Sequence, residues 1–178
     1  LDYAITSTGA VISKCGKPVH RSMLLPADLL KILGAVRNDD VILEGFIDGF
    51  TYADVRYVHK PLDYGCEPEY FEYNRSCHGK IVDMRSFLSK HRNELDLISI
   101  ISTDEKLRNR LWSSIEKACN SVEITTSTDH FVEIMSAEAS KAKALLRLCD
   151  FLNIGMENVC ACGNADNDAD MIAESGLG

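Results

Sequence analysis

The stretch that most constrains the fold of this chain lies near its end, where a short apolar run leads through a polar loop into a helix. The apolar run covers residues 159–162, and Gly163 separates it from a cluster of carboxylates and amides that ends at Asp168. Residues 169–174 predict a short helix that ends at Gly176. This order is the βα unit of an α/β protein, and four small or branched apolar residues in a row are typical of a strand buried on both faces of a parallel sheet.

The polar loop from Gly163 to Asp168 has two interpretations. Parallel sheets place ligand sites outside the carboxyl ends of their strands, and oxygen-rich side chains suit magnesium. Equally, Asp, Asn and Gly are ordinary turn residues, and Asp168 could simply cap the following helix. A calcium loop is disfavoured, because its sixth position is Met171 rather than Gly and its twelfth is Leu177 rather than Glu. The loop alone leaves both interpretations open.

Composition limits the function classes. The 178 residues suffice for one large domain or two small ones, and 46% hydrophobic content allows a buried core. The net charge of −8 disfavours nucleic acid and anionic membranes as partners. The seven cysteines lack zinc-finger spacing, and Cys160 and Cys162 are expected to be small hydrophobic residues inside the strand. No membrane span or signal peptide is evident, so we expect a cytoplasmic protein with reduced thiols.

Hydrophobic periodicity and turn residues predict alternating short strands and helices. Strands are expected at residues 2–6, 10–12, 19–24, 41–47, 50–55, 95–102, 121–127 and 130–135. Helices are expected at residues 26–36, 83–92, 103–119 and 140–152. The segment from Tyr57 to Gly79 is irregular and rich in aromatic residues, and packing is favoured there over a metal site because its His and Cys residues lack ligand spacing.

These elements predict a core domain that is interrupted by an inserted one. The middle of the chain, residues 22–131, pairs its strands in hairpins and therefore indicates an α+β module. The two ends are expected to be pieces of one α/β layer. We therefore expect an α/β protein with a Rossmann-like core in residues 1–21 and 132–178 and an inserted domain in residues 22–131.

One lysine occupies an electrostatically unfavourable position. Ser140 is a natural N-cap for the helix at 140–152, which places Lys141 and Lys143 in the first helical turn. The helix dipole disfavours a cation there by about 0.3–1 kcal/mol. A nearby anion, either a phosphate oxygen or a carboxylate, would compensate. For Lys143 a solvated surface position is the preferred interpretation.

Together these segments resemble the haloacid dehalogenase (HAD) superfamily, in particular the Cof-like phosphatases with a C2B cap. The resemblance covers essentially the whole chain and depends on the order and spacing of several weak motifs rather than on any one of them. Those motifs are Thr6-Ser7-Thr8-Gly9-Ala10, Glu133-Ile134, Ser140-Lys141 and the loop from Gly163 to Met171. The inserted domain corresponds to the cap, in which the segment from Tyr57 to Tyr73 is a candidate for substrate choice.

The resemblance implies a role for each matched residue. Lys141 would be catalytic, neutralising the phosphate and the nucleophilic carboxylate, and Asp168 would be catalytic and a metal ligand. Asn164 would be the second ligand of a Mg²⁺ ion. Thr8, Gly9, Lys141 and Asn167 would bind the substrate, a small phosphorylated metabolite. The implied reaction is phosphoryl transfer to an Asp nucleophile, followed by hydrolysis of the aspartyl-phosphate.

Two departures from the family pattern affect this interpretation. The nucleophile motif is not found among these residues and is expected upstream, so we expect that this fragment alone does not catalyse the reaction. Asn164 stands where the family has an acid, and an amide oxygen can bind Mg²⁺ but brings no charge. A catalytically weakened or non-catalytic homologue that binds a phosphorylated metabolite is therefore the alternative function. A nicotinamide-binding protein is disfavoured, because no Gly-x-Gly-x-x-Gly follows a strand.

Overall fold

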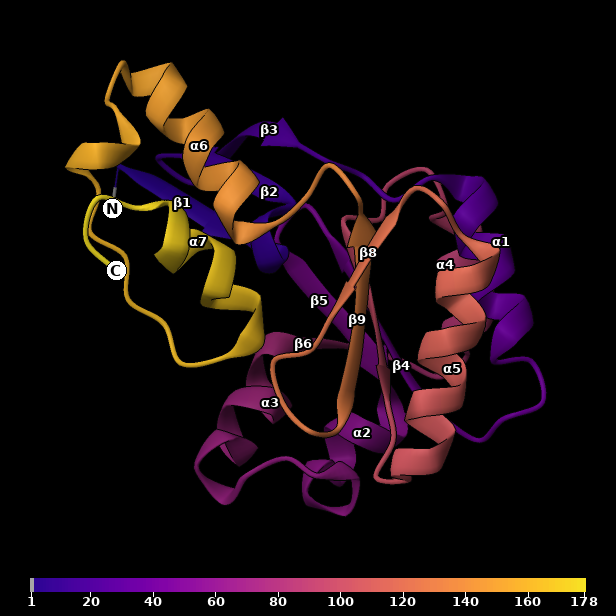
Figure 1. The fold of residues 1–178 in the computed structure, drawn as a ribbon. Helices are drawn as coiled ribbons and strands as arrows, with labels where there is room; N and C mark the ends of the chain where they lie inside the picture. Colours follow the sequence, from indigo (N-terminus) through magenta and orange to yellow (C-terminus); the bar gives the residue numbers. More distant parts are fainter. Residues whose placement is uncertain (1) are drawn as a thin grey trace.

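A computed structural model describes residues 2–178 of the protein as two β-sheets with helices packed around them (Figure 1). The larger sheet has six strands in the order β6-β5-β4-β7-β9-β8. Its strands are antiparallel except for the pair β5–β6, which is parallel. They are β4 (Ile42–Ile47), β5 (Phe50–Asp54), β6 (His78–Ile81), β7 (Leu97–Ile101), β8 (Val122–Thr125) and β9 (Phe131–Ser136).

The smaller sheet comes from the start of the chain and packs with the last helices. It contains β1 (Tyr3–Thr6), β2 (Val11–Lys14) and β3 (Lys17–Arg21), paired antiparallel in sequence order. Two helices from the end of the chain, α6 (Lys141–Leu152) and α7 (Ala169–Glu174), lie beside this sheet (Figure 1). The two ends of the sequence therefore form one unit, and the residues between them build the six-stranded sheet.

Three helices cover one face of the six-stranded sheet. They are α1 (Pro26–Ala35), α4 (Met84–Lys90) and α5 (Glu105–Ala118), and they stand together on one side of the sheet in Figure 1. Asp83 and Asp104 cap the last two by accepting hydrogen bonds from backbone N–H groups of the first turn. Alternate strand residues such as Leu43, Ile98 and Ile134 are buried against these helices. This is the main hydrophobic core.

The opposite face of the same sheet has two apolar patches with polar side chains between them. At one end Ile42, Ala53 and Ile101 pack with Tyr57 and Val58. At the other end Leu97 and Met135 pack with Ala10, Val11 and Ala139. Between the patches lies a row of directly paired residues that are each at most 8% exposed: Glu44, Ser99 and Glu133. Polar groups at the centre of a buried face are unusual and mark this row as a candidate for function.

The aromatic-rich segment, expected to be irregular, forms short helical pieces at one end of the six-stranded sheet. Helix α2 (Val55–His59) follows β5 directly, with the side chain of Asp54 as its N-cap. Two 3₁₀ turns (Pro61–Tyr64 and Pro68–Tyr70) lead into α3 (Phe71–Cys77), which runs into β6. The buried ring of Tyr57 anchors this segment on the sheet.

Two expectations about the ends of the chain need correction. Residues 159–162 were expected to form a strand buried on both faces, but among the described residues they make a single parallel bridge, between Cys160 and Leu177. Cys160 and Cys162 are exposed and only Ala161 is buried, because no neighbouring strand among residues 2–178 pairs with this run along its length. The first strands are likewise antiparallel, not pieces of a parallel layer.

The inserted domain was expected to end at residue 131, which is the first residue of β9. This strand remains paired with β7 from Phe131 to Met135, so residues 132–136 belong to the six-stranded sheet and not to the unit formed by the chain ends. Met135 and Glu123 are also cross-strand partners. The return to that unit comes between Ser136 and Lys141, where α6 begins.

Candidate functional site

The side chain of Lys141 brings two distant parts of the sequence together. Ser140 is the N-cap of α6, and its hydroxyl accepts a hydrogen bond from the N–H of Lys143. This cap fixes Lys141 in the first turn, from which its Nζ atom donates to Asp168 Oδ1 at 2.5 Å and to Asn167 Oδ1 at 2.8 Å. Asp168 is 6% exposed, so its carboxylate is the compensating anion that the lysine's position requires.

The loop that follows Gly163 is shaped around the Asp168 carboxylate. Asp168 Oδ2 accepts hydrogen bonds from the N–H groups of Asn164 (3.1 Å) and Ala165 (3.2 Å). A side chain at position 163 would collide with that of Asp168, so glycine is required there. The hydrogen bond from Lys141 is the main cause that lowers the pKa of Asp168 below its ordinary value, and the two backbone N–H groups add to it. Asp168 makes no side-chain cap bond to α7, so it is not simply a helix cap.

A turn near the start of the chain packs directly against the beginning of α6. Gly9 has φ +97°, and a side chain there would overlap the backbone carbonyl group of Ser140. The preceding residue, Thr8, also has a positive φ of 52°. This close approach places Thr8 beside Lys141 and Asn167 at a small hollow of about 60 Å³. Gly9 is fully packed, and its place in the structure is a contact with the helix that carries Lys141.

Asn164 faces a different and larger hollow. It is exposed and lines a space of about 450 Å³ between the loop after Gly163, the aromatic segment and the turn before β9. Thr8, Lys141 and Asn167 line the small hollow, whereas Asp168 lies beneath the surface and contacts both Lys141 and the backbone of Asn164. The predicted site residues are therefore neighbours, and they border two adjoining openings. Lys143 is exposed and donates to the carbonyl of Ala137, away from this cluster.

Glu133 is a site neighbour to which sequence reasoning assigned no role beyond a motif match. Its side chain lies on the face of β9 away from α1, α4 and α5, where Ser127 Oγ donates to Oε1 at 3.0 Å and Oε2 has no hydrogen-bond partner within residues 2–178. Burial raises the pKa of the Glu133 carboxyl, while Ser127, Lys141 and Asn167 oppose that rise. The sequence did contain a signal for Glu133, because this acidic residue lies between the apolar residues Phe131 and Met135 on the same face of the strand.

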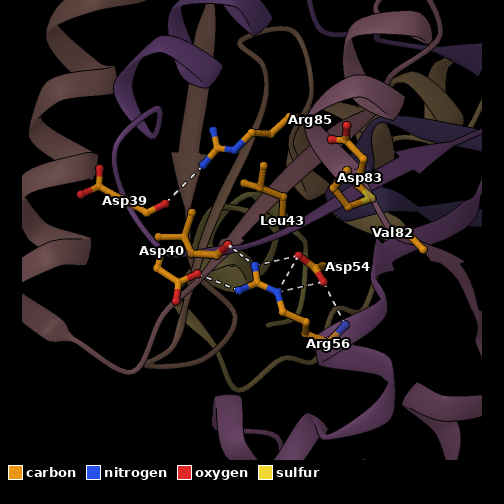
Figure 2. A pocket seen from close by; sticks show the side chains of 10 residues that line it. Asp39, Asp40, Leu43, Asp54, Arg56, Val82, Asp83 and Arg85 are labelled. Carbon is orange, nitrogen blue, oxygen red and sulfur yellow. Dashed lines mark hydrogen bonds and ion pairs between the residues drawn. The ribbon is translucent and has the colours of Figure 1, made fainter.

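A second charged hollow, on the far edge of the six-stranded sheet, is not suited to an anion. Figure 2 shows Arg56 between Asp54 and Asp40, to which it donates at 2.8 Å and 2.7 Å. The guanidinium of Arg85 is also already hydrogen-bonded, because it donates to the backbone carbonyls of Val36 and Asp39. The walls of this hollow of about 290 Å³ carry four aspartates against two arginines. A phosphate would meet excess negative charge there, so the cluster at Lys141 is the better phosphate site.

The oxygen ligands available near Lys141 are of the chemical type that a magnesium ion prefers. Asn164 and Asp168 offer the amide and carboxylate oxygens that Mg²⁺ takes, and this ion commonly completes its shell with water and phosphate. Within residues 2–178 no group of three His, Cys, Asp or Glu side chains is clustered for a metal. Both oxygens of Asp168 already accept hydrogen bonds, so a metal bound at Oδ1 would compete with Lys141.

Solved structures share this fold. A haloacid dehalogenase-like hydrolase from B. subtilis superposes with a TM-score of 0.78 at 20% identity, over 98% of this chain and 67% of that one. The HAD subclass IIB sugar phosphatase BT4131 superposes with a TM-score of 0.76 at 14% identity, over 98% of this chain and 62% of that one. Both contain the mixed α/β arrangement described above, and identities this low establish the fold alone.

Two curated proteins of Bacillus subtilis (strain 168) are similar over part of the sequence. The 5-amino-6-(5-phospho-D-ribitylamino)uracil phosphatase YcsE is 37% identical over 75 residues, which are 42% of this chain and 30% of that protein. Phosphatase YwpJ is 37% identical over 67 residues, which are 38% of this chain and 23% of that protein. The matched stretches thus make up less than a third of these relatives.

The broadest match is to a whole family. Residues 1–178 match the family described as haloacid dehalogenase-like hydrolase, and this match spans both sheets and the Lys141–Asp168 pair. Because the match covers every residue of the chain, and the fold is that of solved members, the protein belongs to the haloacid dehalogenase-like hydrolases.

Proposed function

We propose that the protein is a Mg²⁺-dependent phosphatase of small phosphorylated metabolites. The observation that carries this proposal is the convergence of Lys141 with Asn167 and Asp168, to both of which the Lys141 ammonium group donates a hydrogen bond. An ammonium group held beside oxygen donors can balance the charge of a phosphoryl group during its transfer. The names of the Bacillus relatives, both phosphatases, support the same reaction class.

Each residue has a defined task in this proposal. Lys141 binds a phosphate oxygen and holds Asp168, while Thr8 and Asn167 contact the substrate at the small hollow. Gly9 keeps that turn close to α6. Asn164 and Asp168 would hold Mg²⁺, which supplies positive charge against the phosphate. The phosphoryl acceptor is the Asp nucleophile implied by the family resemblance, so activity is to be measured on the protein at its natural full length.

A second candidate function is a weakened or non-catalytic homologue that binds a phosphorylated metabolite. The specific feature that favours it is Asn164, which contributes no charge to a metal. The only described carboxylate held within reach of Lys141 in an ion pair is that of Asp168. The cytoplasmic location that we propose for either function is supported by the seven cysteines, which are all free thiols. No helix within residues 2–178 has the length and apolar character to cross a bilayer.

The test compares hydrolysis of p-nitrophenyl phosphate with and without Mg²⁺ in the natural protein and in Asn164→Asp. Hydrolysis by the natural protein that requires Mg²⁺ supports the phosphatase. Hydrolysis that appears only in Asn164→Asp supports the weakened homologue. A lack of hydrolysis in both would overturn the phosphatase proposal. Lys141→Met is the internal control, because a true activity of this site must disappear in that variant.

A further inference from the structure

The larger hollow beside the phosphate cluster is a feature to which the proposed function gives no task. It measures about 450 Å³, which is within the range of small-ligand pockets. Its walls come from three separate places: the aromatic segment around Tyr70 and Tyr73, the turn from Ser127 to Phe131, and Asn164 from the loop of Asp168. Figure 1 shows α3, the β8–β9 connection and the loop before α7 on the same side of the sheet.

Through Asn164 the hollow adjoins the proposed phosphate site, which is the cluster of Lys141, Asn167 and Asp168. The side chain of Asn164 lines the hollow, and its backbone N–H donates to the same Asp168 carboxylate that pairs with Lys141. A substrate whose phosphate binds at Lys141 can therefore place its remainder in this adjoining space. That remainder is the leaving group of the proposed hydrolysis.

The chemistry of the walls limits what this leaving group can be. Tyr70 and Tyr73 are 54% and 62% exposed, so their rings are free to stack against a flat partner. Asn74 and Thr128 add amide and hydroxyl groups that bind hydroxyl groups or ring edges. The charged walls are acidic, with Glu67 and Asp129, and no Lys or Arg borders this hollow in the part of the chain described.

Two buried polar atoms near the hollow lack hydrogen-bond partners within residues 2–178. They are Nδ1 of His130, which lines the hollow, and Oε2 of Glu133, whose other oxygen accepts from the lining residue Ser127. Glu133 is 8% exposed. The imidazole of His130 is seated against Gly65, where any side chain would collide with it. Orphaned polar atoms held in place by close packing are typical of a site that a ligand completes.

We propose that the leaving group is an uncharged, hydroxylated group that carries a flat heterocycle, and that a leaving group with a second phosphate is rejected. The inference rests on the proposed phosphatase function and specifies its substrate class. Stacking on Tyr70 and Tyr73 favours the ring, and the acidic walls repel additional negative charge. The amide of Asn74 and the hydroxyl of Thr128 offer hydrogen-bond partners to the ring and the hydroxyl groups.

The test uses three phosphate monoesters that differ by one feature each. Uridine 5′-phosphate has the ring and the hydroxyl groups, ribose 5-phosphate lacks the ring, and uridine 3′,5′-bisphosphate adds one phosphate. We expect kcat/KM at the 5′-phosphate to be about tenfold higher for uridine 5′-phosphate than for ribose 5-phosphate, as expected for stacking of one base. We also expect it to be at least tenfold lower for the bisphosphate. Equal values for all three would overturn the proposal.

Matched variants separate recognition from folding. Tyr73→Leu should lower kcat/KM for uridine 5′-phosphate by about tenfold and leave ribose 5-phosphate within about twofold. Phe50→Leu, an exposed aromatic residue away from the hollow, is the control and should change neither. Equal losses on both substrates in Tyr73→Leu would mean that the residue only supports the fold, and would overturn its role in recognition.

A second pair of variants tests the charge argument. Glu67→Gln combined with Asp129→Asn should reduce discrimination against the bisphosphate by about fivefold per removed charge at most. Glu116→Gln on α5, across the sheet, removes a carboxylate without touching the hollow and should leave the ratio unchanged. An unchanged ratio in the double variant would overturn the electrostatic part of the proposal.

Binding distinguishes failure of this inference from failure of the phosphatase proposal. Uridine itself, the product of the expected hydrolysis, is titrated against the protein by saturation-transfer NMR, with ribose as the comparison. Uridine contacts that weaken in Tyr73→Leu support the inference even if no ester is hydrolysed. A lack of uridine binding in a protein that hydrolyses p-nitrophenyl phosphate would overturn the inference and leave the phosphatase proposal intact.

Discussion

The close approach of Gly9 to α6 makes a quantitative prediction about Gly9→Ala. At φ +97° a residue with a side chain is strained by about 1–2 kcal/mol. The new methyl group would also overlap the backbone carbonyl of Ser140, which cannot rotate aside, and overpacking of this kind costs about 1–3 kcal/mol. The free energy of unfolding should therefore fall by about 2–5 kcal/mol.

Gly16 provides the matched control for this substitution. It has φ +75°, and no heavy atom lies within 4 Å of the place its methyl group would occupy. Gly16→Ala therefore carries only the strain of about 1–2 kcal/mol. Urea unfolding followed by circular dichroism measures both variants, and with a slope of about 2 kcal/mol/M the midpoint of Gly9→Ala should be about 0.5–1.5 M lower than that of Gly16→Ala. Equal midpoints would refute the packing argument.

Three further predictions concern the ion pairs. Lys141→Met should lower the free energy of unfolding by about 1–2 kcal/mol at neutral pH, because a charge-assisted bond is lost while the helix dipole is relieved; an unchanged urea midpoint would contradict this. The lowered pKa of Asp168 means that its stabilisation relative to Asp168→Asn is present above about pH 4 and is lost as the pH falls further; urea titrations at about pH 6 and pH 3 should show the difference shrink, and a constant difference would refute it. Arg21→Met leaves the fully buried Asp96 carboxylate without its guanidinium and should cost about 3–5 kcal/mol at pH 7. Because burial raises the pKa of Asp96, the cost of Arg21→Met should be smaller near pH 4, where the carboxyl is partly protonated, and a larger cost there would contradict the assignment.

Local signals in the sequence predicted much of the secondary structure. The Asp48-Gly49 turn, the Ser140 cap and the helix before Gly176 all occur where turn and cap chemistry placed them. Each is set by residues adjacent in sequence, which is why single-sequence reasoning reached them. The position of Lys141 in a first helical turn indicated only a nearby anion, and the family resemblance, not the helix, pointed to the loop that holds Asp168.

Longer-range features were harder to predict. The run at 159–162 had the composition of a buried strand, but a strand also needs neighbours, and composition does not indicate which partners run beside it. The strand β9 was expected, but its place in the six-stranded sheet was not, because its pairing with β7 joins residues thirty or more positions apart along the sequence. Glu133 and His130 were overlooked as site neighbours, since their importance comes from the three-dimensional meeting of the turn from Ser127 to Phe131 with the loop of Asn164.

The two-sided construction of the six-stranded sheet has a consequence for how such proteins diversify. Glu44, Ser99 and Glu133 lie on the face of the sheet away from α1, α4 and α5, while their immediate neighbours, such as Leu43, Ile98 and Ile134, pack under those helices. Substitutions at positions 44, 99 and 133 can change substrate selectivity with little effect on the packing under the helices. Deleting one residue from β7 would instead exchange the two faces of that strand, turning Ile98 and Ile100 away from the main core and Ser99 into it. Selectivity in this lineage should therefore drift by substitution and seldom by insertion or deletion within strands.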